Sequence, residues 1–334
     1  KVVDIVSARV IVCGNELPEI PITSTAALWR FNEIFDQSKD TGQTDYKSNH
    51  AANDLAQIIF TSGATSEPKG VEITHANILA NIVPIEREVQ KYQTIARPFL
   101  PLRFLNLLPL SHMFGQAMAT FVPPMLKGIT VFMQGYNPTD IVAQIKTNRV
   151  SVLVCVPKIL EVLRDFVIHL DPTAADTTKR PPNVAIRWWR YRKVHRLFGF
   201  KFWTFVVGGA PLDPDLEAFW SRLGFLVIQG YGLTETAPIV TLNHPLRARK
   251  GSVGTAIGGV DLSIADDGEI LVRGANVTRG YYNSPEATAR VFRDGWFHTG
   301  DIGSIDEKGR LSVRGRKKEM IVTADGRNVF PEDI

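Results

Sequence analysis

Short apolar runs alternate with amphipathic segments along the first part of the chain. The runs are short enough to be buried strands, and they cover Leu55–Phe60, Phe104–Leu110, Ile129–Met133, Val150–Val156, Phe202–Val207 and Leu226–Gln229. The segments between them have helical patterns, with Thr74 placed as an N-cap and Pro157 placed to open a helix. Strands that alternate with helices predict an α/β fold with a doubly wound, mostly parallel sheet.

The pattern differs at both ends of the chain. Residues 1–12 alternate apolar and polar positions, which predicts a strand, and Leu28–Phe35 predicts a short helix. After about residue 240, short strands are separated by Gly and Asp turns such as Asp266-Asp267-Gly268. We therefore expect an α/β core over residues 1–240, a small β-rich subdomain over 241–316, and a linker region over 317–334.

One polar loop, Thr61–Gly70, joins a predicted strand to a predicted helix. It contains hydroxyl side chains, glycines and Lys69, a composition that suits a phosphate cradle. The same residues would also form an ordinary solvated turn, and the loop alone leaves both interpretations open. It is not a Walker A loop, because Gly70 and Val71 follow the lysine where that motif needs Ser or Thr.

Composition limits the classes of binding partner and the cellular compartment that we expect. The chain has 334 residues, a formal charge of +4 and a pI near 9.0, which fits an anionic ligand or a weak attraction to a membrane but is too small to indicate nucleic acid. Cys13 and Cys155 stand in separate apolar runs, so we expect buried thiols in a reducing, cytoplasmic location. No apolar run approaches the roughly 18 residues that a membrane span needs, and no signal peptide is visible.

The segment Arg187–Phe198 is both aromatic and basic. Trp188, Tyr191, Val194 and Leu197 recur every three residues, and most positions between them are basic. Such a helix can lie on an anionic membrane surface, so peripheral membrane contact is one expectation. The interpretation that we favour is a helix packed on the sheet with a solvated basic face.

From residue 55 onward the chain resembles the adenylate-forming, or acyl-activating, enzymes. The segments that carry the resemblance occur in the family's order, and they are Thr61–Gly70, Pro109–Gly115, Gln229–Thr236, Gly268–Gly274 with Gly280–Tyr282, Gly295–Asp301, and Gly315–Ile321 with Gly326–Pro331. Within the family, Leu110–Gln116 and Gly208–Asp213 look most like long-chain fatty-acid CoA synthetases. The resemblance implies the large N-terminal domain of this family, with doubly wound, mostly parallel sheets and a small β-barrel-like subdomain.

The resemblance also implies a reaction. A fatty acid would be activated by ATP to acyl-AMP with release of pyrophosphate, and CoA would then displace AMP to form a thioester, with Mg²⁺ as cofactor. Two alternatives remain open. One is an acyl-AMP ligase that loads a carrier protein, and the other is a non-catalytic module that binds nucleotide or associates with a membrane.

Site residues follow from the matched motifs. For the phosphates, the resemblance implies contacts from Thr61, Ser62, Gly63, Thr65 and Lys69. For adenine, it implies stacking by Tyr231, close approach at Gly209 and Ala210, and lining by Gln229, Gly230 and Gly232.

The next group of expected roles concerns the ribose, the metal ion and the phosphates. Asp301 would accept hydrogen bonds from the ribose hydroxyls, and Arg316 would reach the same sugar. Glu235 would bind Mg²⁺, with Thr234 near the phosphates. The competing interpretations are a turn aspartate for Asp301 and a helix-capping carboxylate for Glu235.

Further expectations come from the resemblance. His112 would lie near the carboxylate and the thiol, unless it is a packed structural residue. Residues 317–334 would form the hinge, at Lys318, and the start of the family's small C-terminal domain. Ser66 replaces the glycine usual in the phosphate loop, with a modest expected effect. We expect most of the C-terminal domain, with its catalytic lysine, and the family's first segment to lie outside this sequence, so that the chain binds ATP weakly and adenylates slowly at best.

Overall fold

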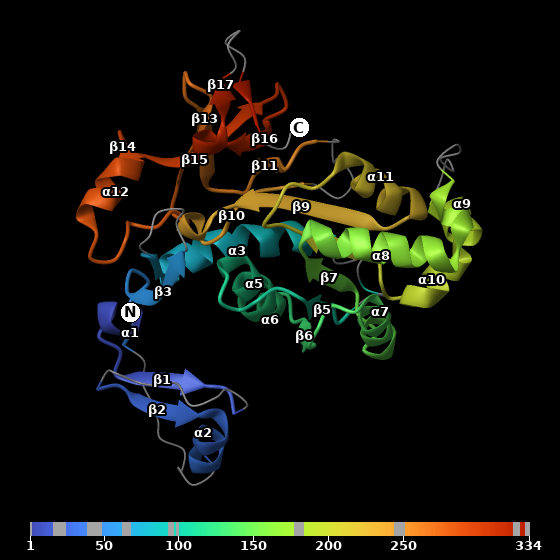
Figure 1. Cartoon of the computed structure of the whole chain (residues 1–334), viewed down its shortest axis with the longest axis horizontal. Coiled ribbons are helices and arrows are strands. Elements are labelled where there is room, and N and C mark those ends of the chain that lie inside the picture. Colours follow the sequence, from blue (N-terminus) through green and yellow to red (C-terminus); the bar gives the residue numbers. More distant parts are fainter. Residues whose placement is uncertain are drawn as a thin grey trace. The chain divides into compact units, whose positions relative to one another are not determined.

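The computed structural model describes most of the chain, in two compact units (Figure 1). The described residues are 2–15, 25–38, 49–61, 68–92, 97, 100–176, 184–243, 251–322 and 328–330. One unit comprises Lys1–Ala51 with Phe60–Lys69, and the other comprises Ala52–Ile59 with Gly70–Ile334. The domain boundaries expected at residues 240 and 316 stay predictions.

Two of the secondary-structure predictions for the first unit are wrong. Its described elements are α1 (Val2–Ile5), β1 (Val10–Cys13), β2 (Ala27–Arg30) and α2 (Phe31–Ser38). The described part of residues 1–12 thus contains a helical turn before a strand, and Leu28–Phe35 spans the end of a strand and the start of a helix. Pairing decides this, because β1 and β2 form a parallel ladder from Val10–Ala27 to Cys13–Arg30. The helix begins where the Glu33 carboxylate accepts the Arg30 N–H at 3.0 Å.

The second unit is built on a 12-stranded mixed sheet, as far as the structure describes it. Five neighbouring strands are parallel, in the order β6-β5-β7-β8-β9, and they are β5 (Arg103–Asn106), β6 (Ile129–Phe132), β7 (Val152–Cys155), β8 (Thr204–Val207) and β9 (Leu226–Gly232). The chain leaves β5 for β6 on one side and returns to β7 on the other, so the sheet is doubly wound. The α/β fold predicted from the alternating pattern is confirmed.

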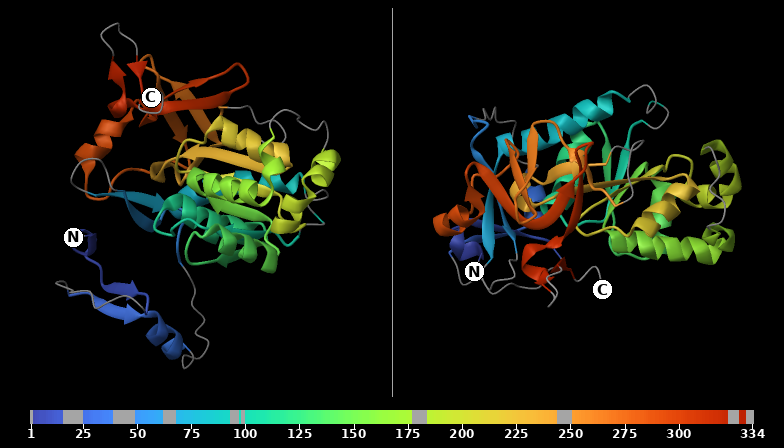
Figure 2. Two further views of the ribbon diagram at one scale, coloured as in Figure 1. Left: turned by 45° about the vertical axis from the view of Figure 1, so that its right-hand side comes forward. Right: turned by 90° about the horizontal axis from the view of Figure 1, so that it is seen from above.

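Helices cover both faces of the parallel strands. Adjacent residues such as Phe104 and Leu105 point to opposite faces, and both are buried. One face packs against α7 (Pro138–Thr147), α8 (Pro157–Leu170), α10 (Arg192–Phe198) and α11 (Pro214–Leu223). The other packs against α3 (His75–Gln90), α5 (Met113–Gln116), η2 (Ala117–Phe121) and α6 (Val122–Met125). Seen from above, α3 and α8 lie on opposite sides of the sheet (Figure 2).

Several local expectations can be compared with these elements. Thr74 caps α3 as expected, because its hydroxyl accepts the Asn77 N–H at 3.2 Å, and Pro157 opens α8. Cys13 and Cys155 are free and buried. The segment Arg187–Phe198 is not one helix: α9 (Val184–Arg190) ends before Tyr191, whose side chain is fully buried, and α10 follows. No helix in the described ranges has the length and apolar character needed to cross a membrane.

Beyond β9 the same sheet continues with antiparallel strands. They are β10 (Ile239–Leu242), β11 (Gly254–Ala256), β12 (Val260–Ile264), β13 (Glu269–Gly274), β15 (Trp296–Ile305) and β16 (Arg310–Arg316), with β14 (Phe292–Arg293) paired to β15. Short elements complete this region: η3 (Pro172–Ala175), η4 (Thr234–Thr236), α12 (Pro285–Val291), η5 (Lys317–Glu319), β17 (Ile321–Val322) and β18 (Asn328–Val329). A separate sheet pairs β3 (Leu55–Thr61) with β4 (Lys69–Thr74). The antiparallel strands enclose their own apolar core around Ile270, Val272 and Phe297.

Leu153, at the centre of β7, tests the importance of the buried sheet. Its side chain has no exposed surface, so Leu153→Ala leaves a cavity that should lower the free energy of unfolding by roughly 2–5 kcal/mol. Denaturant unfolding measures this value. The control is Leu170→Ala, where a leucine that is 52% exposed should change stability by about 0.5 kcal/mol or less. Equal losses for the two variants would contradict the role given to the β7 core.

Candidate functional site

The carboxyl ends of the parallel strands gather most of the residues expected in the site. In a doubly wound sheet, ligands bind outside these ends where the winding reverses, which here is between β5 and β7. The chain leaves β5 toward His112, leaves β8 toward Gly209 and Ala210, and leaves β9 through Tyr231 toward Glu235. The topology therefore places these motifs at one edge of one sheet.

The segment with His112 is shaped by the turn that follows β5. Asn106 is buried, and its amide donates to the Leu108 carbonyl at 2.9 Å, which fixes the start of the turn. Gly115 allows the turn to close, because a Cβ there would lie 2.3 Å from the Pro109 carbonyl oxygen. His112 itself is exposed and precedes α5. It is therefore not the packed structural histidine that the alternative interpretation proposed.

The end of β8 meets the same turn. A Cβ on Gly208 would lie 2.8 Å from the Phe114 ring, so the two segments are in close contact. Gly209 and Ala210 follow, and both are exposed. Gly209 has a φ of +85°, a conformation that favours glycine. These small residues thus leave the backbone exposed at this edge of the sheet.

The segment Gln229–Gly232 is held by its neighbours on both sides. Gln229 is buried and pairs with Val207 of β8. Gly232 has to be glycine, because a Cβ would lie 1.7 Å from the Pro238 carbonyl oxygen. Gly230 is similarly tight, at 2.9 Å from the Thr241 carbonyl oxygen. The close return of the chain along β10 therefore fixes the position of Tyr231.

Tyr231, Asp301 and Arg316 form the best-defined cluster of the site. The Tyr231 hydroxyl donates to one Asp301 oxygen at 2.7 Å, and Arg316 Nε lies 3.0 Å from the other. Asp301 and Arg316 are direct partners across β15 and β16, which explains why residues 15 positions apart meet. The Asp301 carboxylate is buried, whereas Arg316 is partly exposed. A carboxylate has about four lone-pair positions, so both contacts leave capacity for further donors.

Burial dominates the electrostatics of this cluster. Burial raises the pKa of Asp301, although Arg316 and the Tyr231 hydroxyl act in the opposite direction, and the charge of Glu235 raises it further. Burial and the neighbouring Asp301 charge also raise the pKa of Tyr231 well above its ordinary value, so its hydroxyl stays a donor. The Asp301 carboxylate is buried, but its partner Arg316 is partly exposed. A carboxylate in this position is suited to accept hydrogen bonds from two neighbouring hydroxyl groups.

Glu235 lies in η4, directly after the β9 turn. One of its oxygens accepts the Tyr281 hydroxyl at 2.8 Å, and its backbone carbonyl accepts the Thr278 N–H at 2.8 Å. Burial and the Glu235 charge raise the pKa of Tyr281, which keeps that hydroxyl protonated. Tyr281 in turn bridges to Val71 of β4. Glu235 is thus connected to the strand that follows the opening loop, and it is half-buried rather than a helix cap.

Two buried asparagines hold η4, and a third holds the chain on both sides of Asn276. None of the three was predicted from the sequence. On α3, Asn81 donates to the carbonyls of Thr236 and Ile239 at 3.2 and 2.6 Å. Asn276 donates to the Thr236 carbonyl at 2.9 Å. Asn77 donates to the carbonyls of Ala275 and Val277 at 2.8 and 3.0 Å. The only sequence signal was the appearance of amides at i and i+4 on an otherwise apolar helix face.

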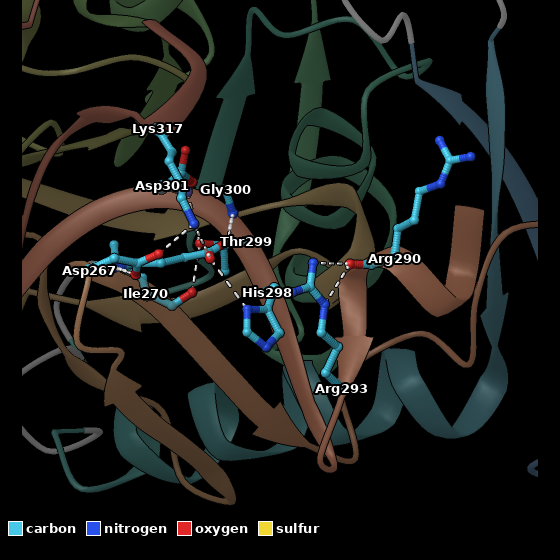
Figure 3. A network of polar contacts seen from close by, with 10 residues as sticks. Asp267, Ile270, Arg290, Arg293, His298, Thr299, Gly300, Asp301 and Lys317 are labelled. Atoms are coloured by element: carbon cyan, nitrogen blue, oxygen red, sulfur yellow. Dashed lines mark hydrogen bonds and ion pairs between the residues drawn. The ribbon is translucent and has the colours of Figure 1, made fainter. Parts of the chain in front are cut away.

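A second network surrounds Glu269 and borders the Asp301 cluster (Figure 3). The Glu269 carboxylate accepts the Gly300 N–H at 2.9 Å and lies 3.0 Å from the Lys317 ammonium. Lys317 also contacts Asp267 at 2.6 Å. Glu269 belongs to the motif Gly268–Gly274, but the sequence predicted no function for this residue.

The other expected residues are less connected. Thr61 donates to the Lys69 carbonyl at 3.4 Å across the base of the opening loop. Ser62, Gly63 and Thr65, with Ser66, lie outside the described residues. Thr234 begins η4 and is half-buried, and Lys318 is exposed in η5, 3.9 Å from Glu319. In the described part of the chain, no group of three or more His, Cys, Asp or Glu side chains could hold a metal ion.

The structure therefore joins some of the expected residues and leaves others apart. Hydrogen bonds or ion pairs connect Tyr231, Asp301 and Arg316, and backbone packing connects the His112 segment with Gly208. Among the residues that the structure describes, neither His112 nor Lys318 forms a hydrogen bond or ion pair with Tyr231, Asp301 or Arg316. Their functional roles, like those of all the site residues, stay predictions.

Asparagine at position 301 tests whether the buried carboxylate destabilises the fold. The pKa of Asp301 is raised in the folded state. The protonated carboxyl therefore contributes to the free energy of unfolding at low pH, and this contribution is lost as the pH rises through the folded-state pKa. We expect Asp301→Asn to have a higher Tm than the wild type near neutral pH, with the difference narrowing in acid. Thermal unfolding across this pH range measures it. A lower Tm at neutral pH would mean that Arg316 and Tyr231 more than offset the burial.

Comparison with known proteins gives the family. The model of the family described as AMP-binding enzyme matches residues 6–282. The long-chain-fatty-acid–CoA ligase FadD15 of Mycobacterium tuberculosis is 35% identical over 308 residues, which cover 84% of this chain and 49% of that protein. A feruloyl-CoA synthase of Amycolatopsis is 32% identical over 295 residues, covering 84% and 53%. The chain thus spans about half the length of the curated relatives that it matches.

Solved structures agree on the fold. Apo MatB from Rhodopseudomonas palustris matches with a TM-score of 0.78 and 27% identity, over 99% of this chain and 63% of that one. The O-succinylbenzoate CoA synthetase MenE from Bacillus subtilis, in complex with AMP, has a TM-score of 0.77 and 23% identity, with the same coverage. The fold is that of the large N-terminal domain of adenylate-forming enzymes, and the chain belongs to the AMP-binding enzyme family.

Proposed function

We propose that this chain forms the nucleotide- and acyl-binding part of an AMP-forming acid–thiol ligase. The reaction would activate a fatty acid with ATP to acyl-AMP and pyrophosphate, and then transfer the acyl group to CoA. The family supports acyl-adenylate formation, and relatives named as fatty-acid–CoA ligases support the substrate class. A feruloyl-CoA synthase among the relatives is the reason to test aromatic acids beside fatty acids.

The observation that carries this proposal is the cluster of Tyr231, Asp301 and Arg316. It combines an aromatic ring at a strand end, a buried carboxylate with lone pairs to spare, and a partly exposed guanidinium. The ring would stack on adenine, and the carboxylate would accept both ribose hydroxyls. Gly209 and Ala210 are exposed and have small or no side chains, so they would let the base approach the backbone closely.

The chemistry requires two anions to meet. Attack of a carboxylate on the α-phosphate needs charge neutralisation and alignment more than covalent help from the protein. Lys69 and the hydroxyls of the opening loop would hold the outer phosphates, with Thr234 beside them. His112, exposed at the end of β5, would position the carboxylate and later the thiol.

Glu235 fits the expected magnesium ligand. Its carboxylate is half-buried and Tyr281 uses only one lone pair, so other positions can face a cation. Mg²⁺ favours such a site, since it takes one or two carboxylates together with phosphate oxygens and water, and it would neutralise phosphate charge there. Tyr281 would orient the carboxylate.

A pyrophosphate assay tests the proposed reaction. We expect pyrophosphate release that depends on ATP, Mg²⁺ and a fatty acid, measured on this chain and on the full product of its gene. Glu235→Gln should lower the rate by about 100-fold, because the proposed ligand of the Mg²⁺ that neutralises the phosphate charge is lost. Equal release without any acid, or no loss in Glu235→Gln, would contradict the proposal.

The acid and the acceptor are tested in the same assay. A panel of fatty acids of increasing length and of aromatic acids such as ferulate identifies the acid. Comparison of CoA with an acyl carrier protein as acceptor separates the CoA ligase from the carrier-loading alternative. Preference for an aromatic acid would overturn the proposed fatty-acid class.

A second proposal, contact with an anionic membrane surface, comes from α9 and α10. Residues 184–201 contain six Arg and Lys residues and no Asp or Glu. Trp189 is 72% exposed and Phe200 is 69% exposed. The Arg192 guanidinium lies 5.3 Å from the Trp189 ring centroid, so cation and aromatic surface occur together. Exposed aromatics among cations favour the interface of an anionic bilayer.

Co-sedimentation with vesicles tests this surface. We expect binding to vesicles that contain phosphatidylserine, weaker binding to pure phosphatidylcholine, and a loss of roughly tenfold in Trp189→Ser/Phe200→Ser, because interfacial aromatics contribute apolar burial. Tyr136→Ser is the control, since Tyr136 is 56% exposed outside α9 and α10. Equal sedimentation of both variants would contradict this surface.

A further inference from the structure

Glu269 is a buried carboxylate to which the proposed chemistry gives no role. Its side chain is 9% exposed, at the start of β13. One oxygen accepts the Gly300 N–H at 2.9 Å. The other lies 3.0 Å from the Lys317 ammonium and 3.3 Å from His298 Nδ1. Figure 3 shows His298 and Gly300 of β15 and Lys317 of η5 directed toward one region.

These contacts adjoin both residues expected at the ribose. Gly300 directly precedes Asp301, and Lys317 directly follows Arg316. A single side chain therefore contacts a neighbour of each: the backbone N–H of Gly300 beside Asp301, and the ammonium group of Lys317 beside Arg316. Lys317 also directly precedes Lys318, the expected hinge.

On its β13 side, the sheet ladder does not hold this part of β15. Pairing between β13 and β15 is regular at Leu271–His298 and again at Glu269–Ile302, but it shifts between them. The residues of β15 within the shift need other acceptors, as buried backbone N–H groups do. The Glu269 carboxylate accepts the Gly300 N–H, and the Thr299 hydroxyl accepts the Asp301 N–H at 3.1 Å while it donates to the Ile270 carbonyl.

Charge makes this support strong. Burial alone would raise the pKa of Glu269, but hydrogen bonds from Lys317, Gly300 and His298 lower it below its usual range. Hydrogen bonds to Asp267 and Glu269 raise the pKa of Lys317. Both groups are therefore charged at neutral pH, and hydrogen bonds between charged groups are shorter and stronger than neutral ones.

We propose that Glu269 is a positioning residue for the nucleotide, which orients Asp301 through the Gly300 N–H and Arg316 through Lys317. The inference rests on the proposed function, since it assumes that Asp301 binds ribose hydroxyls. It deepens that function by assigning a residue that touches no ligand. The same ion pairs anchor the chain at Lys317, so that a rotation at Lys318 would start from a fixed point.

Nucleotide binding by this chain separates positioning from a merely structural role. The affinities for ATP and for 2′,3′-dideoxy-ATP, which lacks both ribose hydroxyls, are measured by calorimetry. In Glu269→Ala and Glu269→Gln we expect ATP to bind about tenfold more weakly, with dideoxy-ATP changed by less than about twofold. Lys317→Met should show the same selectivity to a smaller extent, and Lys317→Arg should restore ATP binding.

Two reference variants complete the test. Asp301→Asn should lose the preference for ATP over dideoxy-ATP directly. Asp261→Asn breaks the exposed ion pair with Arg273 in the same hairpin and should change neither affinity. Equal losses for the two nucleotides in the Glu269 and Lys317 variants, or no loss, would overturn the positioning role. If the wild-type chain binds neither nucleotide, the proposed function itself is wrong.

Discussion

The site depends on one buried charge, the Asp301 carboxylate. A carboxylate inside a protein is tolerated only when donors and cations surround it. Here two donors contact it, the Tyr231 hydroxyl from the end of β9 and the Arg316 guanidinium from β16. Glu269 accepts the Gly300 N–H in the residue before Asp301. The parallel and antiparallel parts of the sheet are thus joined at the position where a ribose would bind.

The sequence predicted the α/β core well, because burial on both faces leaves a clear pattern. Runs such as Val150–Val156 are apolar throughout, and the structure buries β7 completely. Prediction was wrong where elements are very short. The alternation in residues 1–12 did not reveal that one helical turn precedes β1, and the periodicity of Arg187–Phe198 did not reveal the break at buried Tyr191. In both places tertiary contacts outweigh local preference.

The sequence motifs selected some residues that the fold brings together, whose functional roles stay predictions, and they did not reveal the residues that hold these in place. Tyr231, Asp301 and Arg316 could be selected from motifs, and the fold brings them together. Their supports could not be selected in this way. Asn81 and Asn276 are linked to Thr236 over 155 and 40 positions, and the Glu269–Lys317 contact spans 48. Contacts at such separations leave no local pattern in a single sequence.

The asparagine contacts of α3 have a consequence for the order in which the protein is made. Asn81 leaves the ribosome long before its acceptors, the carbonyls of Thr236 and Ile239, have been synthesised. Until then α3 carries a polar amide on the face that later becomes buried, and complete docking would leave that amide without partners. α3 can therefore pack fully against the sheet only after β9 and η4 have been synthesised. In newly made chains, the region around η4 therefore takes its final form late.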